Sequence, residues 1–154
     1  ARKDHLEQTI RPALARGCWV LCDRFSDSTR AYQGVLGDVE PEVIEGLDRL
    51  IVGRTRPDLT LMLDLPADVG LARAALRRRA AQGSSDAPDR FEEEGLAFHE
   101  RLRGAFRQIA AGEPERCALI DAQRGPDEVA QEIWSVVAQR LDPSDKARWA
   151  VRGA

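Results

Sequence analysis

Residues 18–34 read CWVLCDRFSDSTRAYQG, a short apolar run followed by charged and polar residues. Its first five residues form a short apolar run without polar alternation. Such a run is typical of a strand that is buried on both faces of a parallel sheet. The run ends abruptly at Asp23 and Arg24, and two further apolar runs, at 59–65 and 117–121, also carry an aspartate at or near their ends.

Amphipathic segments alternate with these predicted strands. Leu6, Ile10 and Leu14 recur every four residues, which predicts a helix over about 2–16 that stops at Gly17. Apolar stripes of the same kind predict further helices from Pro41 to just before Gly53, and at about 91–111 and 126–141. Another helix, at about 67–81, is expected after Pro66. On two of these helices we expect these residues to face inward: Val43, Ile44, Leu47, Leu50 and Ile51, then Leu96, Leu102, Phe106 and Ile109.

Strands that alternate with helices predict an α/β domain with a parallel sheet. In such sheets ligands bind beyond the carboxyl ends of the strands. The candidate site residues at those ends are therefore Asp23, Arg24, Asp64 and Asp121. The segment 82–89 is rich in small and turn residues and predicts a flexible interruption, and the tail 142–154 lacks periodicity and is expected to be disordered.

The composition excludes several kinds of function. The 154 residues carry a net charge of −3, which gives the whole chain no electrostatic reason to bind nucleic acid or an anionic membrane. No apolar run approaches the length of a membrane span. The three cysteines form no Cys-x-x-Cys pair, and no histidine lies near a cysteine, so a metal site is not predicted. A reduced, cytoplasmic protein is the simplest interpretation.

The Asp23-Arg24 pair carries charge at the end of a predicted buried strand. That placement is costly unless both charges have a role there. An arginine presents a planar fork that matches a phosphate, and an aspartate can orient the arginine or order a metal-bound water. Ser28, Thr29, Tyr32 and Gln33 follow and offer hydroxyl and amide groups for a sugar or a base. The structural alternative is a salt bridge that caps the next helix.

A second group of cations lies on the helix predicted at 67–81. Arg73 and Arg77 share a face, and Arg78 and Arg79 widen the basic surface. A mobile lid that carries arginines could stabilise a transferring phosphoryl group and exclude water. The alternative is a solvated basic face balanced by the glutamates at 92–94. A nucleic-acid site is disfavoured, because the patch is short and the chain is acidic.

Residues 21–33 closely resemble the signature of the thymidylate kinases, with the pattern Leu-Cys-Asp-Arg-Phe-x-x-Ser-Thr-x-Ala-Tyr-Gln. Three further stretches resemble the family in the expected order: ARKDHLEQTIRPALARG at 1–17, RPDLTLMLDLPADVGLAR at 56–73 and DRFE at 89–92. The resemblance covers about 1–141, with a lid at about 73–92. It implies a P-loop NTPase-type nucleoside monophosphate kinase fold that transfers the γ-phosphate of ATP to dTMP with Mg²⁺, in a homodimer.

The resemblance also implies roles for single residues. Arg24 would bind the dTMP phosphate with Asp23 beside it, and Tyr32 would lie where a 2′-hydroxyl would sit. Ser28, Thr29 and Gln33 would line the nucleoside pocket, and Arg2 would hydrogen-bond the thymine base. Arg73 would stack on adenine, next to the loop of Ala122 and Gln123. Arg77 would approach the transferring phosphate, as in the bacterial subtype, although Arg78 and Arg79 are alternatives for that role.

One family feature is missing from these residues. Thymidylate kinases begin with a central strand and a Gly-rich loop that ends in Gly-Lys-Ser/Thr, and neither Lys3 nor Lys146 has that context. The chain has no initiating Met, and the thymine-stacking Phe expected just before Arg2 is absent. We therefore expect an incomplete C-terminal part of such an enzyme, inactive and unstable alone. Another P-loop deoxynucleotide or deoxynucleoside kinase, or a degenerate nucleotide-binding module, is the alternative.

Overall fold

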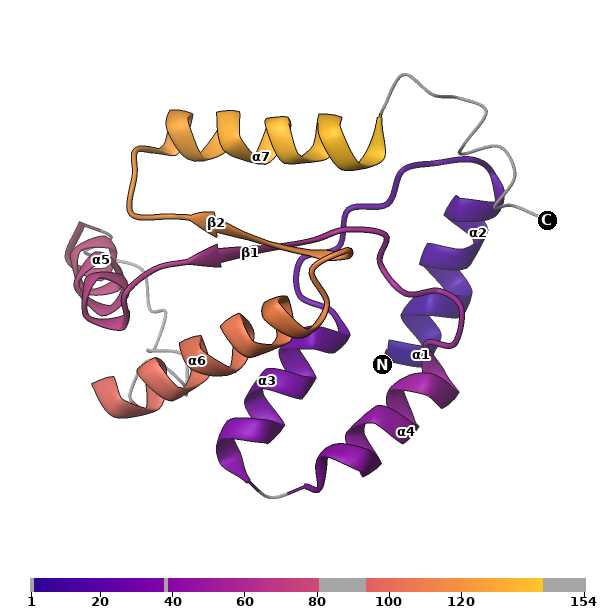
Figure 1. The fold of residues 1–154 in the computed structure, drawn as a ribbon, viewed down its shortest axis with the longest axis horizontal. Coiled ribbons are helices and arrows are strands. Elements are labelled where there is room, and N and C mark those ends of the chain that lie inside the picture. The colour runs from indigo at the N-terminus through magenta and orange to yellow at the C-terminus, as the bar shows by residue number, and fades with distance from the viewer. Residues whose placement is uncertain (1, 38, 81–93, 143–154) are drawn as a thin grey trace.

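The computed structural model describes residues 2–37, 39–80 and 94–142 (Figure 1). Helices dominate this part of the chain, and two strands lie among them. The elements in chain order are α1 (Arg2–His5), the π-helix η1 (Leu6–Ile10), α2 (Arg11–Ala15), α3 (Ser26–Leu36), α4 (Pro41–Ile51), β1 (Thr60–Asp64), α5 (Ala67–Ala80), α6 (Leu96–Gly112), β2 (Cys117–Asp121) and α7 (Pro126–Leu141).

The two strands form a parallel pair, as the sequence predicts. β1 and β2 are in register from Thr60 opposite Cys117 to Asp64 opposite Asp121. The crossover between them contains α5 and α6. Figure 1 shows α6 on one face of the pair and α7 on the other. Because both faces are covered, apolar side chains such as Ile120 can be fully buried.

Three small apolar clusters hold the helices in place. Met62 and Cys117 of the strands pack against Ala110 of α6. Ala31 of α3 packs against Phe98 and Leu102 of α6. The third cluster joins Leu6 and Ile10 to Val52, just beyond α4. Helix α3 therefore lies against α6, and η1 lies against the end of α4.

The helix predicted at 2–16 runs from Arg2 to Ala15, with a wider turn inside it. Pro12 lacks a backbone N–H, so the regular helical bond from residue 12 to residue 8 cannot form. The backbone N–H of Arg11 instead bonds the carbonyl of Leu6, five residues earlier, in a π turn. Gly17 ends the helix with a φ of 73°, a conformation that glycine adopts without steric cost.

The strand predicted at 18–22 is wrong for this structure. These residues are not in a strand, and Leu21 is 99% exposed. A strand requires backbone hydrogen bonds to a neighbour. Among the described residues, the only backbone ladder is the one between β1 and β2. The apolar run therefore belongs to no β ladder among the described residues, and Asp23 and Arg24 do not follow a strand.

The predicted inner faces of two helices are only partly confirmed. On α4, Ile44 is buried, whereas Val43, Leu47 and Leu50 are exposed by 51%, 51% and 82%. On α6, Leu102 is buried as expected, but Leu96 at the first turn is exposed. None of the helices in the described ranges is both long and apolar enough to cross a membrane.

Candidate functional site

A large hollow of about 1760 Å³ lies beside the segment 18–22. It is lined by that segment, by β1 and by parts of α3, α5 and α6. Asp23, Arg24, Ser28 and Tyr32, all predicted from the sequence as site residues, line it together with Asp64. The hollow therefore brings polar residues of the stretches 21–33 and 56–73 to one surface.

Arg24 stacks on Tyr32 in a cation–π contact. The guanidinium carbon lies 5.0 Å from the centre of the Tyr32 ring. The backbone of Arg24 has a φ of 59°, which is uncommon for a residue other than glycine, and it turns the chain into α3. A guanidinium in such a contact can still donate its N–H groups to phosphate oxygens.

Arg2 reaches the same helix from the beginning of the chain. Its guanidinium donates a hydrogen bond to the hydroxyl of Thr29 and lies 5.7 Å from the centre of the Phe25 ring. Two arginines that are 22 positions apart in the sequence therefore contact α3 about one turn apart, Arg2 at Thr29 and Arg24 at Tyr32. Phe25 was not assigned a role from the sequence, although it lies inside the signature stretch.

Ser28 and Gln33 complete the predicted residues of α3. Both side chains are half-buried. Gln33 lies one turn after Thr29, and its backbone carbonyl accepts a hydrogen bond from Gly37, where the helix ends. We name the group of Arg2, Arg24, Phe25, Ser28, Thr29, Tyr32 and Gln33 the α3 cluster.

A second cluster forms where α5 meets the loop after β2. The guanidinium of Arg73 donates hydrogen bonds of 2.7 Å and 2.8 Å to the carbonyls of Ala122 and Gln123. The carboxylate of Asp121 accepts a bond of 3.0 Å from the backbone N–H of Gln123. Arg73, Ala122 and Gln123 are the residues that the resemblance groups around adenine, and we name them the α5 cluster.

The remaining lid arginines extend from the last turn of α5. Arg77, Arg78 and Arg79 are all exposed there. The rest of the predicted lid, including DRFE at 89–92, lies outside the described residues, as does most of the tail predicted at 142–154. All three arginines therefore stay candidates for the catalytic role predicted for Arg77.

Asp64 forms an ion-pair group that sequence analysis missed. Arg103 donates to both of its carboxylate oxygens, at 2.8 Å and 3.0 Å, and Arg107 donates at 2.6 Å. The hydrogen bonds and charge of Arg103 lower the pKa of Asp64, and Arg107 adds to the effect. The spacing of Arg103 and Arg107, four residues apart on α6, was the available signal.

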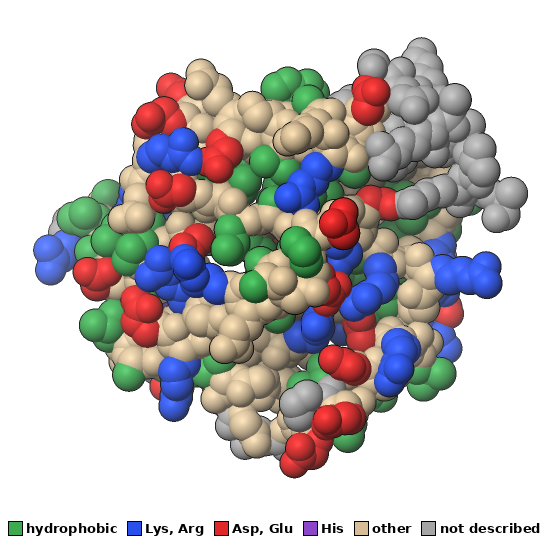
Figure 2. All heavy atoms as spheres, viewed as in Figure 1, with side chains coloured by type: hydrophobic (Ala, Val, Ile, Leu, Met, Phe, Trp, Pro, Cys, Tyr) green, Lys and Arg blue, Asp and Glu red, His purple; other side chains and the backbone are tan. Residues whose placement is uncertain are grey.

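Charge is mixed over much of the surface. On the face that Figure 2 draws, acidic and basic side chains are interspersed among the described residues. No group of three or more histidine, cysteine or acidic side chains gathers as a metal site within the part of the chain that the structure describes. Magnesium that arrives with a nucleotide does not need such a group, because phosphate and water oxygens supply most of its ligands.

Comparison with known proteins identifies the family. The family model described as thymidylate kinase matches residues 1–133. A thymidylate kinase of Rhodopseudomonas palustris (strain TIE-1) is 58% identical over 141 residues, which cover 92% of this chain and 59% of that protein. The corresponding protein of Bradyrhizobium diazoefficiens is 56% identical over 144 residues, 94% of this chain and 61% of its own length. That of Nitrobacter hamburgensis is 50% identical over 152 residues, 99% and 64% respectively.

The chain belongs to the thymidylate kinase family. It spans about three fifths of the length of the curated relatives it matches. Thymidylate kinases have a P-loop NTPase fold, and the parallel strands with helices on both faces agree with an α/β fold of that type. The matched region contains both the α3 cluster and the α5 cluster.

Proposed function

We propose that the protein containing this chain phosphorylates dTMP to dTDP with ATP. Family membership supports this proposal, since the relatives over 50% identical to the chain are described as thymidylate kinases. The observation that carries it furthest is the convergence of Arg2 and Arg24 on α3. Arg24 can supply a cation for a phosphate, and Arg2, about one helix turn away, can supply a hydrogen-bond donor for a base. Together these two groups suit a nucleoside monophosphate.

Within this proposal the α3 cluster binds dTMP. Arg24 donates to the phosphate of dTMP, and Asp23 lies next to it in the chain with an exposed carboxylate. Tyr32 fills the space beside the deoxyribose, so that a ribonucleotide with a 2′-hydroxyl is rejected. Arg2 donates to the thymine base, while Ser28, Thr29 and Gln33 line the nucleoside pocket.

The α5 cluster would bind ATP. Arg73 is held against the carbonyls of Ala122 and Gln123 and offers the flat face of its guanidinium to adenine. A lid arginine, Arg77 in our assignment, neutralises charge on the transferring phosphoryl group. Bound Mg²⁺ would neutralise charge on the ATP phosphates. The exposed carboxylate of Asp23 fits one of its bound waters.

The domain extent, the location and the oligomeric state of the enzyme are also part of the proposed function. We infer that 1–141 belongs to one kinase domain with a lid at about 73–92, in a cytoplasmic protein that works as a homodimer. The exposed apolar side chains of Val43, Leu47 and Leu50 on α4 support an interface with a second copy, because a water-exposed apolar stripe gains free energy when covered.

A nucleotide panel tests the function. The full-length product of the gene that encodes this chain is assayed with ATP, Mg²⁺ and each of dTMP, dCMP, dGMP and UMP. We expect dTMP to be phosphorylated far faster than the others. The Arg24→Ala variant should lose at least about 100-fold in kcat/KM for dTMP, since a preorganised cation on the phosphate is removed.

The control variant is Arg101→Ala, which removes an exposed arginine of α6 outside both clusters. It should keep the activity of the wild type. Preference for another nucleotide would indicate a different P-loop deoxynucleotide kinase. A well-folded full-length protein that phosphorylates none of them would contradict the proposed function.

A further inference from the structure

Helix α3 has one side that carries the α3 cluster and another side that is buried against the rest of the protein. At about 100° per residue, positions 28, 29, 32 and 33 share one side of a helix, and positions 27, 30 and 31 share the other. The first side carries the helical members of the α3 cluster. The second side carries Asp27, Arg30 and Ala31, where Asp27 is 5% exposed and Ala31 is 1% exposed. The position of this buried side therefore determines the direction in which the ligand side points.

Both carboxylate oxygens of Asp27 accept hydrogen bonds from neighbouring side chains. Arg116 donates to its two oxygens, at 2.8 Å and 2.9 Å, in a fork-to-fork contact. Arg30 adds a bond of 3.2 Å from the next helical turn, and the hydroxyl of Thr60 lies 3.3 Å away. Burial alone favours the neutral acid, but Arg116 and then Arg30 outweigh it, so the pKa of Asp27 lies below its ordinary value.

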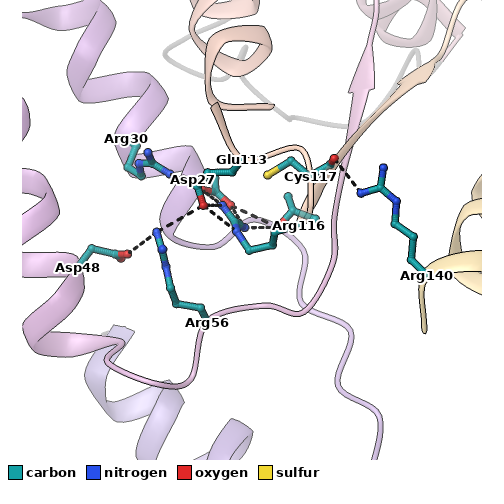
Figure 3. Close-up of polar contacts among 9 residues, drawn as sticks. Asp27, Arg30, Asp48, Arg56, Glu113, Arg116, Cys117 and Arg140 are labelled. Carbon is teal, nitrogen blue, oxygen red and sulfur yellow. Dashed lines mark hydrogen bonds and ion pairs between the residues drawn. The ribbon is translucent and has the colours of Figure 1, made fainter. Parts of the chain in front are cut away.

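Arg116 connects this carboxylate to both strands. It immediately precedes β2, and its backbone carbonyl accepts a hydrogen bond of 2.8 Å from Thr60, the first residue of β1. Its side chain donates to the hydroxyl of Thr60 at 2.6 Å and to Glu113 at 3.0 Å. Figure 3 shows Arg116 pointing from the start of β2 toward Asp27 and Glu113, with Arg30 beside them.

The outer part of the same network reaches α4. Arg56 lies 3.8 Å from Asp48 of α4 and 3.8 Å from Glu113. Glu113 also accepts a hydrogen bond from Arg30. Three carboxylates and three guanidinium groups thus alternate between α3, α4 and the strand starts (Figure 3). Charges of opposite sign are matched, so the network can be buried without a large net charge.

Apolar packing alone would not fix the rotation of α3. On its buried side Ala31 contacts Phe98 and Leu102 of α6, and Tyr32 packs at the edge of that cluster. Apolar contacts are non-directional, and Ala31 offers a small side chain that permits a helix to slide or turn. A bidentate guanidinium–carboxylate contact has a defined plane and direction. The Asp27–Arg116 pair therefore supplies the angular constraint that the apolar cluster lacks.

We propose that Asp27 and Arg116 are positioning residues for the α3 cluster, fixing the first turn of α3 so that Arg24, Thr29 and Tyr32 face dTMP together. Neither side chain touches the substrate in this proposal. Both act through α3. The proposal rests on the proposed function, because it assigns the ligand side of α3 to dTMP.

The test is a set of steady-state assays on the full-length gene product. The variants are Asp27→Asn, Arg116→Met and the double variant, with KM measured for dTMP and for ATP separately. We expect each single variant to raise the KM for dTMP about 10-fold, while the KM for ATP changes less than about 2-fold. The double variant should be no worse than the poorer single variant, because the pair acts as a unit.

Arg140→Met is the matched control. Arg140 donates hydrogen bonds of 2.9 Å and 3.1 Å to the carbonyls of Pro114 and Cys117, so it supports the same strand start without touching α3 (Figure 3). Its loss should lower thermal stability and leave the KM for dTMP unchanged. Arg116→Lys keeps the positive charge but loses the two-pronged guanidinium contact. It should raise the KM for dTMP by less than Arg116→Met does. It also replaces Arg116→Met in the test if that variant does not fold.

Each outcome has one meaning. Wild-type protein that neither binds dTMP in calorimetry nor phosphorylates it would overturn the function, and the positioning role with it. An active wild type with unchanged dTMP KM in Asp27→Asn and Arg116→Lys would overturn only the positioning role. An equal rise for dTMP and ATP, or the same rise in Arg140→Met, would mean that the network serves general stability alone, and would also overturn it.

Discussion

Asp27 and Asp64 make the same contacts at opposite ends of β1. Each carboxylate receives a two-pronged contact from one arginine and a further bond from a second. They differ in burial. The Asp27 and Arg116 side chains are 6% and 13% exposed, whereas Arg103 and Arg107 beside Asp64 are 26% and 52% exposed.

This difference changes what the two groups can do. A pair that is excluded from water holds its partners strongly, because removing one charge leaves the other without compensation. A pair that water can reach exchanges easily with solvent or with a ligand. The Asp27 network therefore suits a fixed support, and the Asp64 group, whose arginines reach water, can rearrange more easily.

The largest expected effect is on stability. Asp27→Asn in the full-length protein should lower the free energy of unfolding by roughly 2–3 kcal/mol, since the partly buried Arg116 and Arg30 lose their counter-charge. Asp64→Asn should cost less than about 1 kcal/mol, because its arginines can turn to water. Denaturant unfolding of the two variants and the wild type measures both. Equal losses would remove the distinction between the two ends of β1.

A smaller effect should follow from acid. The pKa values of Asp27 and Glu113 are lowered in the fold because Arg116 and Arg30 outweigh the effect of burial. Groups with lowered pKa values stabilise the fold above their unfolded pKa, near 4, and this stabilisation is lost as the pH falls through the folded pKa. The free energy of unfolding should thus decline as the pH drops below about 4.5.

The variant Asp27→Asn tests how much of this pH dependence comes from the Asp27 carboxylate. Removing one such carboxylate should reduce the slope of unfolding free energy against pH by up to about 1.4 kcal/mol per unit over that window. The measurement is denaturant unfolding at a series of pH values between about 2 and 6. An unchanged slope in the variant would show that the Asp27 carboxylate is not held in its charged form by the fold.

Much of this architecture could be predicted from the sequence. Apolar periodicity predicted most of the helices, and short continuous apolar runs predicted the two paired strands, because both patterns report local burial. No such pattern was identified for α3, Ser26–Leu36. The family resemblance grouped Arg73 with Ala122 and Gln123 around adenine, and Arg2 with Thr29 around dTMP. In the structure Arg73 bonds the carbonyls of Ala122 and Gln123, and Arg2 bonds Thr29, while their roles toward nucleotides stay predictions. Arg2, Thr29 and Arg73 lie inside the dense, family-specific stretches 1–17, 21–33 and 56–73, where the residue pattern carries information about the ligand.

Other features could not be predicted, for physical reasons. Asp27 and Arg116 are 89 positions apart, and nothing in local spacing indicates that two charges so distant will pair. The apolar run at 18–22 has the composition of a strand, but strand formation depends on a neighbour that composition does not specify. Leu50 was expected to face inward because its helix stripe continues there, yet nothing in the described structure covers it.

In the proposed function the α3 cluster binds dTMP and the α5 cluster binds ATP. Calorimetric titration of each nucleotide into full-length Arg24→Ala and Arg73→Ala tests it most directly. We expect a crossed pattern. Arg24→Ala should weaken dTMP binding at least about 10-fold and leave ATP binding nearly unchanged, and Arg73→Ala should do the reverse. If both variants weakened the same nucleotide, or if neither changed any affinity, the assignment of the two clusters would be contradicted.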